Sequence, residues 1–179
     1  MSPETDRLRA EPISSAHQDE MVRLLSDPRV AATLGGAPSP ARVAAMIERQ
    51  AGQFDRHGFG IWVWREKATG DLVARGGLQR THVGGRDEVE VGWAVAADRW
   101  GEGLATELGA ASVRAGFDEH GLADLVSFTL PTNVASRRVM EKLGFAYDRD
   151  VVYAELPHVL YRLASLGQAE RPGTAIPAS

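Results

Sequence analysis

The 179-residue sequence contains no cysteine, which excludes disulfides, zinc-thiolate sites and a cysteine nucleophile. It also lacks a run approaching the ~20 apolar residues that a membrane-spanning helix needs. The N-terminus carries Glu4 and Asp6 and has neither the basic nor the apolar region of a signal peptide. We therefore expect a cytoplasmic protein with no membrane partner.

Positive charge and metal-ligand spacing are also scarce. The formal net charge of −4 argues against nucleic acid as a partner. The five histidines are scattered without the spacing of metal ligands, so we expect no metal. The length and the 44% apolar content predict a single domain over residues 1–166. The polar segment 167–179, punctuated by glycine and proline, is expected to be a disordered tail.

Turn and capping residues predict the first elements. A strand is expected over 7–13, followed by a helix that a capping box of Ser15 and Gln18 opens and Asp27-Pro28 stops. A second helix should begin at Ser39-Pro40 and end at Gly58. The pattern then alternates between strands and helices: strands over 59–67, 72–79 and 88–95, a helix over 106–117, a strand over 124–130, a helix over 132–143 and two strands within 151–163. Gly92 inside the third of these strands suggests a bulge.

A glycine turn, Trp100-Gly101-Glu102-Gly103-Leu104-Ala105, lies between the strand 88–95 and the helix that follows it. Glycine lets a backbone approach a phosphate closely, and the unpaired N–H groups of a first helical turn attract anions. The turn therefore predicts a phosphate cradle. Taken alone, such a glycine pair more often only shapes a tight turn, and the accompanying motifs favour the cradle.

Three motifs in this order make the chain recognisable. With Asn133-Val134-Ala135-Ser136 and Glu141-Lys142-Leu143-Gly144-Phe145, the glycine turn resembles the GNAT superfamily of acyl-CoA-dependent N-acetyltransferases over about residues 7–164. Glu90-Val91-Gly92-Trp93 is most similar to the Rim-type branch, which includes N-terminal acetyltransferases of ribosomal proteins. The resemblance implies an α+β (mixed α/β) domain with a central, mostly antiparallel twisted sheet. Its fourth and fifth strands, 88–95 and 124–130, would be parallel and splayed, with helices on both faces.

The same resemblance implies acetyl-CoA as the co-substrate. Backbone groups of Ala94 and Val95 would hydrogen-bond the pantetheine amides, and Asn133 would anchor the cofactor from the other side of the cleft. The pyrophosphate would lie on Gly101, Glu102, Gly103, Leu104, Ala105 and Thr106. Asn133 can also be read as a helix N-cap, and the two roles can coexist.

Two residues of the turn depart from the family pattern. Trp100 stands where the superfamily usually has Gln or Arg, and Glu102 stands where the Rim-type branch commonly has Lys or Arg. A carboxylate beside a pyrophosphate is repulsive, although water limits this effect to about a kcal/mol or less. We therefore expect Glu102 to point to solvent and the backbone donors to carry the binding.

Acetyl transfer needs an uncharged amine and a base. An α-amino group with a pKa of about 8 is roughly a tenth neutral near pH 7, whereas a lysine-like amine near 10.4 is almost fully protonated. Glu90 is the candidate base, since it lies on its strand just before the expected bulge, where a carboxylate could take the amine proton directly or through water; Glu88, two residues back on the same face, is the reserve. The alternative reading of Glu90 is a solvated residue on an exposed strand face.

The leaving thiolate needs a hydrogen-bond donor or an acid. Many family members place a tyrosine in the helix after the asparagine, but the matching position here is Met140. Ser136, one helical turn after Asn133, could donate to the departing sulfur. Its hydroxyl could equally bond back to its own helix.

The resemblance thus predicts direct transfer of an acetyl group to a primary amine through a ternary complex. The acceptor would be a protein N-terminus or a small molecule, and Arg80 and Arg86 could attract an acidic one, although both could equally be surface residues. The alternative is a catalytically silent acyl-CoA-binding or regulatory module of the same fold. Pairing through the C-terminal strands would make a homodimer possible.

Overall fold

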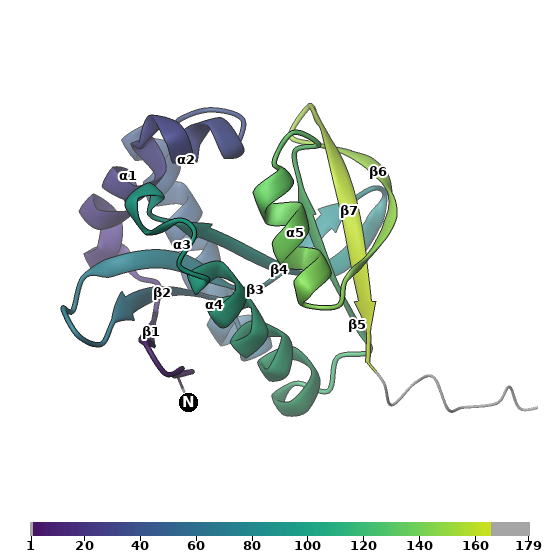
Figure 1. The fold of residues 1–179 in the computed structure, drawn as a ribbon, viewed down its shortest axis with the longest axis horizontal. Coiled ribbons are helices and arrows are strands. Elements are labelled where there is room, and N and C mark those ends of the chain that lie inside the picture. The colour runs from purple at the N-terminus through teal and green to yellow at the C-terminus, as the bar shows by residue number, and fades with distance from the viewer. Residues whose placement is uncertain (1, 166–179) are drawn as a thin grey trace, which may run out of the picture.

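A seven-stranded sheet in the order β1-β2-β3-β4-β5-β7-β6 forms the centre of the protein (Figure 1). The computed structural model describes residues 2–165. The strands are β1 (Leu8–Pro12), β2 (Ile61–Glu66), β3 (Leu72–Val83), β4 (Arg86–Val95), β5 (Asp124–Thr129), β6 (Ala146–Tyr153) and β7 (Leu156–Ala164). All neighbours pair antiparallel except β4 and β5, which are parallel. The predicted mixed α/β fold with a parallel central pair is confirmed.

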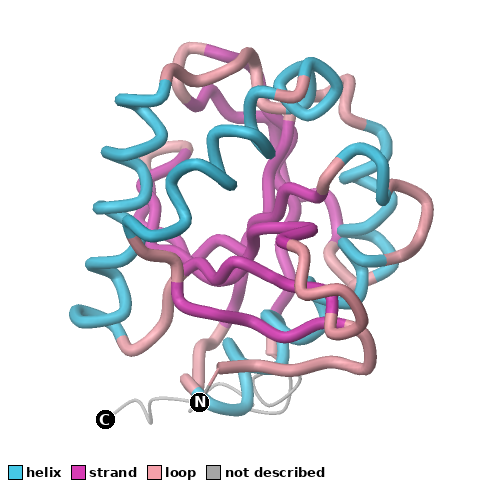
Figure 2. Tube along the Cα trace, turned by 90° about the vertical axis from the view of Figure 1, so that its left-hand side faces the viewer, coloured by secondary structure: helices cyan, strands magenta, loops and turns pink. Residues whose placement is uncertain are grey.

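Helices cover both faces of this sheet (Figure 2). They are α1 (Gln18–Ser26), α2 (Pro28–Thr33), α3 (Pro40–His57), α4 (Leu104–Arg114) and α5 (Val134–Lys142). One core cluster joins Met21 of α1 and Ile47 of α3 to Ala94 of β4. On the other face, Leu108 of α4 packs in a cluster with residues of β1, β2 and β3, and Met140 of α5 packs in a cluster with Val91. Side chains of β4 therefore alternate between a face covered by α1 and α3 and a face covered by α4 and α5.

The predicted end of the first helix at Asp27-Pro28 is confirmed, because α1 ends at Ser26, but a short helix that the sequence did not predict, α2, begins at once. Asp27 Oδ1 accepts a hydrogen bond from the Arg29 N–H at 2.9 Å, so Asp27 caps α2, and Pro28 occupies the first turn of that helix. Proline is tolerated there because its missing N–H would have no intrahelical partner. The capping box lies one residue earlier than predicted, between Ser14 and His17, and opens a 3-10 turn before α1. The cap of α3 by Ser39 and its end at Gly58 are confirmed.

The bulge predicted at Gly92 is wrong. β3 and β4 pair in uninterrupted register from Ala74 with Val95 to Val83 with Arg86. A Cβ atom on Gly92 would lie 3.0 Å from Glu90 Oε1, which is tighter than ordinary contacts. The glycine therefore gives room to a buried carboxylate instead of marking a bulge.

Residues 167–179, the predicted tail, lie outside the described residues. Within residues 2–165, no helix is both long enough and apolar enough to cross a membrane.

The close packing of α4 on the sheet depends on Gly76. A Cβ atom there would meet Leu108 Cδ1 at 2.6 Å and the Gly92 carbonyl oxygen at 2.8 Å. We expect Gly76→Ala to lower the free energy of unfolding by about 1–3 kcal/mol, because a packed core does not yield to an added methyl group. Gly52→Ala in α3 is the matched control, since its Cβ would meet only the flexible end of Arg56, and helix propensity favours Ala by up to ~1 kcal/mol. Urea unfolding that gives both variants the same stability would contradict this packing.

Candidate active site

The two parallel strands part almost as soon as they meet. β4 and β5 pair at one position within the described residues, Glu90 with Val126. β4 continues from Glu90 to Val95, and β5 continues from Val126 to Thr129. Glu90 therefore lies at the vertex of a wedge that opens toward the C-terminal ends of both strands.

The register of β3 and β4 decides which peptide groups face this wedge. The Ala96 N–H donates to the Val73 carbonyl at 2.8 Å, in the same register as the pair of Ala74 and Val95. Because hydrogen-bonded positions alternate along an antiparallel pair, Ala94 also directs its peptide groups toward β3. Val95 directs its groups toward the wedge, and its carbonyl accepts a hydrogen bond from Trp100 Nε1 at 2.9 Å. Val95, and not Ala94, thus lines the opening with its backbone.

The glycine turn leads directly into α4. Gly101 has φ +84° and Gly103 has φ +80°, values that glycine adopts without strain, and Gly103 is the N-cap of the helix. Six consecutive N–H groups donate no hydrogen bond to another described residue: those of Gly101, Glu102, Gly103, Leu104, Ala105 and Thr106. A run of free donors at a helix N-terminus is a site for an anion.

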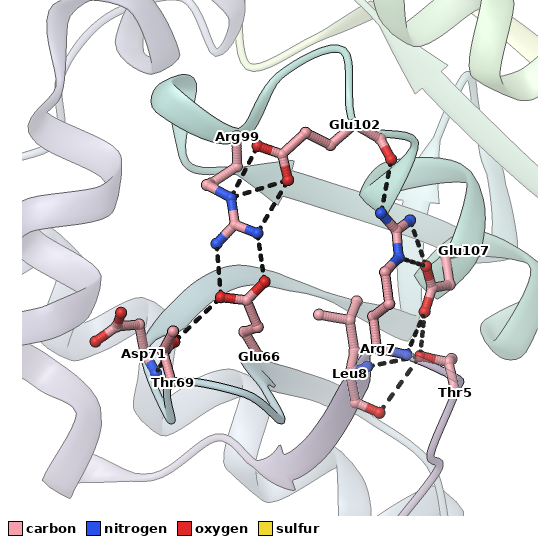
Figure 3. A network of polar contacts seen from close by, with 9 residues as sticks. All are labelled: Thr5, Arg7, Leu8, Glu66, Thr69, Asp71, Arg99, Glu102 and Glu107. Carbon is pink, nitrogen blue, oxygen red and sulfur yellow. Dashed lines mark hydrogen bonds and ion pairs between the residues drawn. The ribbon is translucent and has the colours of Figure 1, made fainter.

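Two arginines attach this turn to the first two strands (Figure 3). Arg7, which precedes β1, donates from Nη1 to the Glu102 carbonyl oxygen at 2.9 Å and from Nε to Glu107 Oε2 at 2.7 Å. The same Glu107 carboxylate accepts from Thr5 Oγ1. These bonds orient the Glu102 carbonyl away from the free N–H groups and hold the first turn of α4 in place.

Arg99 makes the second attachment. Its Nε donates to the Glu102 carboxylate at 3.0 Å, and its Nη2 donates to Glu66 Oε1 of β2 at 2.6 Å. Both carboxylates raise the pKa of Arg99, so its charge is permanent. Glu102 is exposed, as expected, and its carboxylate also forms an ion pair with Arg99. Because Arg99 is shared with Glu66, it offsets only part of the negative charge in the turn.

Glu90 is a buried carboxylate, 8% exposed, on the β4 face that α1 and α3 cover. The Gln79 Nε2 donates to its Oε2 at 2.6 Å, and Gln50 of α3 donates in turn to Gln79 Oε1 at 3.3 Å. Burial raises the pKa of Glu90 above its ordinary value of 4.5, against the opposing effects of the Gln79 hydrogen bond and of Arg75. The reading of Glu90 as a solvated surface residue is therefore wrong.

A cavity of about 250 Å³ lies over Glu90. Its walls come from α2, α3, β3, β5 and the turn between β6 and β7, and they include Gln50, Arg75, Gln79, Thr129, Tyr153 and His158. Glu90 faces this cavity from the vertex of the wedge. A carboxylate with a raised pKa that faces a cavity is suited to take a proton from a bound amine.

Glu88, the reserve candidate, is held in ion pairs. Its carboxylate accepts from both terminal nitrogens of Arg162 on β7, at 2.6 and 3.1 Å, and lies 3.7 Å from Arg149 Nη2. Glu88 is thus engaged with β6 and β7, and it is not among the residues that line the cavity. The arrangement favours Glu90 over Glu88.

Asn133 and Ser136 lie on the β5 side of the wedge. Asn133 Oδ1 accepts from the Ser136 N–H at 3.2 Å, which confirms Asn133 as an N-cap, and its Nδ2 donates to Thr129 Oγ1 at 3.0 Å. One amide N–H of Asn133 remains free to donate. The Ser136 hydroxyl makes no hydrogen bond to another described residue, and Ser136 is not among the residues that line the cavity. Met140, at the position of the family's tyrosine, is buried in the core.

Within the described residues, no three histidine, aspartate or glutamate side chains gather in a way that could hold a metal ion. The residues that sequence reasoning missed are Arg75, Gln79 and Gln50, which surround Glu90. The one sequence feature that could have indicated them is a polar or charged residue at a position of a strand or helix that faces inward.

Comparison with known proteins gives a consistent result. A family model described as "Acetyltransferase (GNAT) domain" matches residues 7–146. The uncharacterized protein YkkB of Bacillus subtilis is 26% identical over 162 residues, which cover 90% of this chain and 94% of that protein. The FsC-acetyl coenzyme A-N(2)-transacetylase of Aspergillus fumigatus is 30% identical over 155 residues, covering 80% of this chain and 64% of the relative.

The solved structure of an acetyltransferase from Agrobacterium tumefaciens has the same fold. It superposes with a TM-score of 0.82 at 22% identity, over 92% of this chain and 95% of that one.

The raised pKa of Glu90 predicts how stability depends on pH. Below pH 4.5, Glu90 is protonated in both the folded and the unfolded protein; as pH rises from there through the folded-state pKa, the unfolded chain loses the proton first, and stability is lost. We expect the stability of Glu90→Gln, relative to that of the unmodified protein, to increase as pH rises above 4.5. The Tm difference between the variant and the unmodified protein should grow by at least about 2 °C, which corresponds to about 1 kcal/mol of unfolding free energy at this chain length.

The control is Glu48→Gln, which changes an exposed carboxylate on α3. A Tm difference for Glu90→Gln that stays constant with pH, like that of the control, would contradict the buried-carboxylate assignment.

Proposed function

The chain belongs to the GNAT acetyltransferase family, and from that premise we propose that it transfers the acetyl group of acetyl-CoA directly to a primary amine. The proposal is carried by one observation: the wedge between β4 and β5 combines a site for an anion with a buried carboxylate. A row of free backbone donors lies at the N-terminus of α4, and a buried carboxylate, Glu90, lies at the vertex between β4 and β5. A relative whose name describes an acetyl coenzyme A transacetylase supports the same donor.

The donor would bind along the wedge. The free N–H groups of Gly101 to Thr106 suit the pyrophosphate, since they offer positive ends of peptide dipoles and the Glu102 carboxylate is held by Arg99. The Val95 peptide group would hydrogen-bond the pantetheine arm. The Trp100 indole, which donates a hydrogen bond to the Val95 carbonyl, would either remain there beside the arm or be displaced by it. Asn133 would donate its remaining amide N–H from the opposite side.

The amine would react at the vertex. Its nitrogen attacks the thioester carbonyl carbon, the new C–N bond forms, the C–S bond breaks, and Glu90 takes the proton that the amine loses, directly or through water. Burial suits Glu90 to this step, because a carboxylate with a raised pKa binds a proton more strongly than a solvated one.

The departing sulfur would be stabilised by Ser136. Its hydroxyl is free of hydrogen bonds to other described residues, and its helix turn is fixed by the Asn133 cap. Met140 is buried in the core, so the tyrosine position of the family supplies no acid here. A module that binds acyl-CoA without turnover is the outcome expected if neither Glu90 nor Ser136 acts.

The proposal is tested by thiol release from acetyl-CoA across a panel of amines, which includes peptides with free N-termini and small-molecule amines. We expect release with at least one class, and a loss of about a hundredfold or more in kcat/KM for Glu90→Gln, because positioned bases contribute on that scale. Calorimetric titration should show that this variant still binds acetyl-CoA.

Glu88→Gln separates a base from a structural carboxylate. It breaks the ion pairs with Arg162, so we expect a lower Tm with the pH profile of kcat unchanged. Acetyl-CoA binding without release for any amine would favour the silent module and overturn the proposal.

The role of Ser136 is tested separately. We expect Ser136→Ala to lower kcat about tenfold or more with unchanged affinity for acetyl-CoA, since only the developing thiolate loses a hydrogen bond. The control is Ser26→Ala, an exposed serine at the end of α1. Steady-state kinetics that show equal kcat for the two variants would remove Ser136 from the mechanism.

A further inference from the structure

The cavity over Glu90 carries more positive than negative charge. Arg49 of α3 and Arg75 and Arg80 of β3 line it, whereas Glu90 is its one lining carboxylate. None of these four side chains forms an ion pair with another residue of the described part of the chain. Arg80 pairs with Val89, so its side chain lies on the face of β3 opposite to Glu90. Arg49 and Arg75 are therefore the guanidinium groups that a cationic acceptor would meet with repulsion.

Arg75 is the most unusual of the three arginines. Its Nε and Nη1 atoms are buried and have no hydrogen-bond partner within residues 2–165. Arg75 as a whole is half-buried, and the burial of these two nitrogens lowers its pKa, because no bonded carboxylate compensates for their lost hydration. Buried charges are normally paired, so an unpaired guanidinium at a cavity wall indicates that its partner is the ligand.

Arg75 lies near the candidate base, so a ligand bound to Arg75 would also lie near Glu90. Arg75 and Gln79 lie on the same face of β3, and Gln79 hydrogen-bonds Glu90. Glu90 exerts the largest charge effect on Arg75, yet the two do not reach ion-pair distance. A ligand that fills the space between them would meet a proton acceptor at one end and a guanidinium at the other.

We propose that the acceptor is an amine that carries a carboxylate close to it, as a free α-amino acid does, and that Arg75 binds this carboxylate. The inference rests on the proposed function and names its substrate class. The planar guanidinium matches a carboxylate in shape and charge. The amine would then lie toward Glu90, lose its proton to that carboxylate and form the new amide bond with the acetyl carbon, as the C–S bond of acetyl-CoA breaks and coenzyme A leaves as the thiolate; the acceptor's carboxylate remains unchanged on Arg75.

The same charges disfavour other acceptors. Polyamines and aminoglycosides carry several positive charges and would be repelled by Arg49 and Arg75. A peptide N-terminus presents a neutral amide in place of the carboxylate, so it would leave the guanidinium uncompensated. The cavity thus discriminates by the group beside the amine.

The experiment uses the unmodified protein and matched acceptors: several amino acids, each as the free acid, as the α-amide and as the amine without the carboxyl group. We expect kcat/KM for the free acid to exceed that for the other two forms by at least about tenfold. The carboxylate raises the pKa of the amine, so intrinsic reactivity near pH 7 favours the amide, and a preference for the acid must come from the protein.

Arg75→Gln should remove most of this preference by lowering kcat/KM for the acid while that for the amide changes little; Arg75→Lys should retain part of it. Arg86→Gln, an exposed arginine at the start of β4 that does not line the cavity, is the control and should keep the full preference. Tm measurements identify any variant that fails to fold, and the comparison of acceptors on the unmodified protein stands without variants.

Equal or better turnover of the amide or the simple amine would overturn this inference and leave the proposed acetyl transfer intact. Absence of thiol release with every acceptor would overturn the proposed function and the inference together.

Discussion

The architecture of the site depends on one constraint: β4 and β5 are held together at a single pair of residues, Glu90 and Val126. Sheets are stabilised by continuous ladders, and a parallel pair that parts after one position leaves peptide groups without partners. Here the loss is confined to the C-terminal ends of the two strands, where a ligand can supply the missing hydrogen bonds. The antiparallel neighbours β3 and β7 hold each strand from its other side, so the wedge stays open without loosening the sheet.

The vertex of this wedge also contains a carboxylate whose burial is energetically unfavourable. Glu90 is desolvated, and the surroundings offset only part of the cost through Gln79 and Gln50. Gly92 leaves room for the carboxylate, and Arg75 contributes charge without contact. Functional sites commonly carry such uncompensated groups, because the ligand completes them. The polar network of Arg7 and Arg99 lies at the opposite end, where it fixes the glycine turn rigidly (Figure 3).

The order of the elements could be predicted from the sequence, because periodicity and capping residues are local signals. The cap of α3 at Ser39 and its end at Gly58 are examples. Tertiary contacts could not be predicted in this way. Gly92 looks like a bulge until the position of Glu90 is known, and the ion pair of the exposed Glu102 is visible only once the fold places Arg99 beside it. Nothing in the sequence around Arg75 marks it as a site residue. Its significance is visible only in the folded protein, where its buried Nε and Nη1 atoms have no hydrogen-bond partner within residues 2–165. The likeness to a family likewise indicates the donor, whereas the acceptor depends on this cavity.

The central claim is that the buried carboxylate of Glu90 is the base, and the pH dependence of kcat/KM tests it most directly, because this quantity reports the ionisation of the free enzyme. The Gln79 hydrogen bond favours the ionised form of Glu90. Gln79→Leu should therefore move the acidic limb of the profile to higher pH, for a fixed acceptor amine. An acidic limb that stays in place or moves to lower pH would contradict the account.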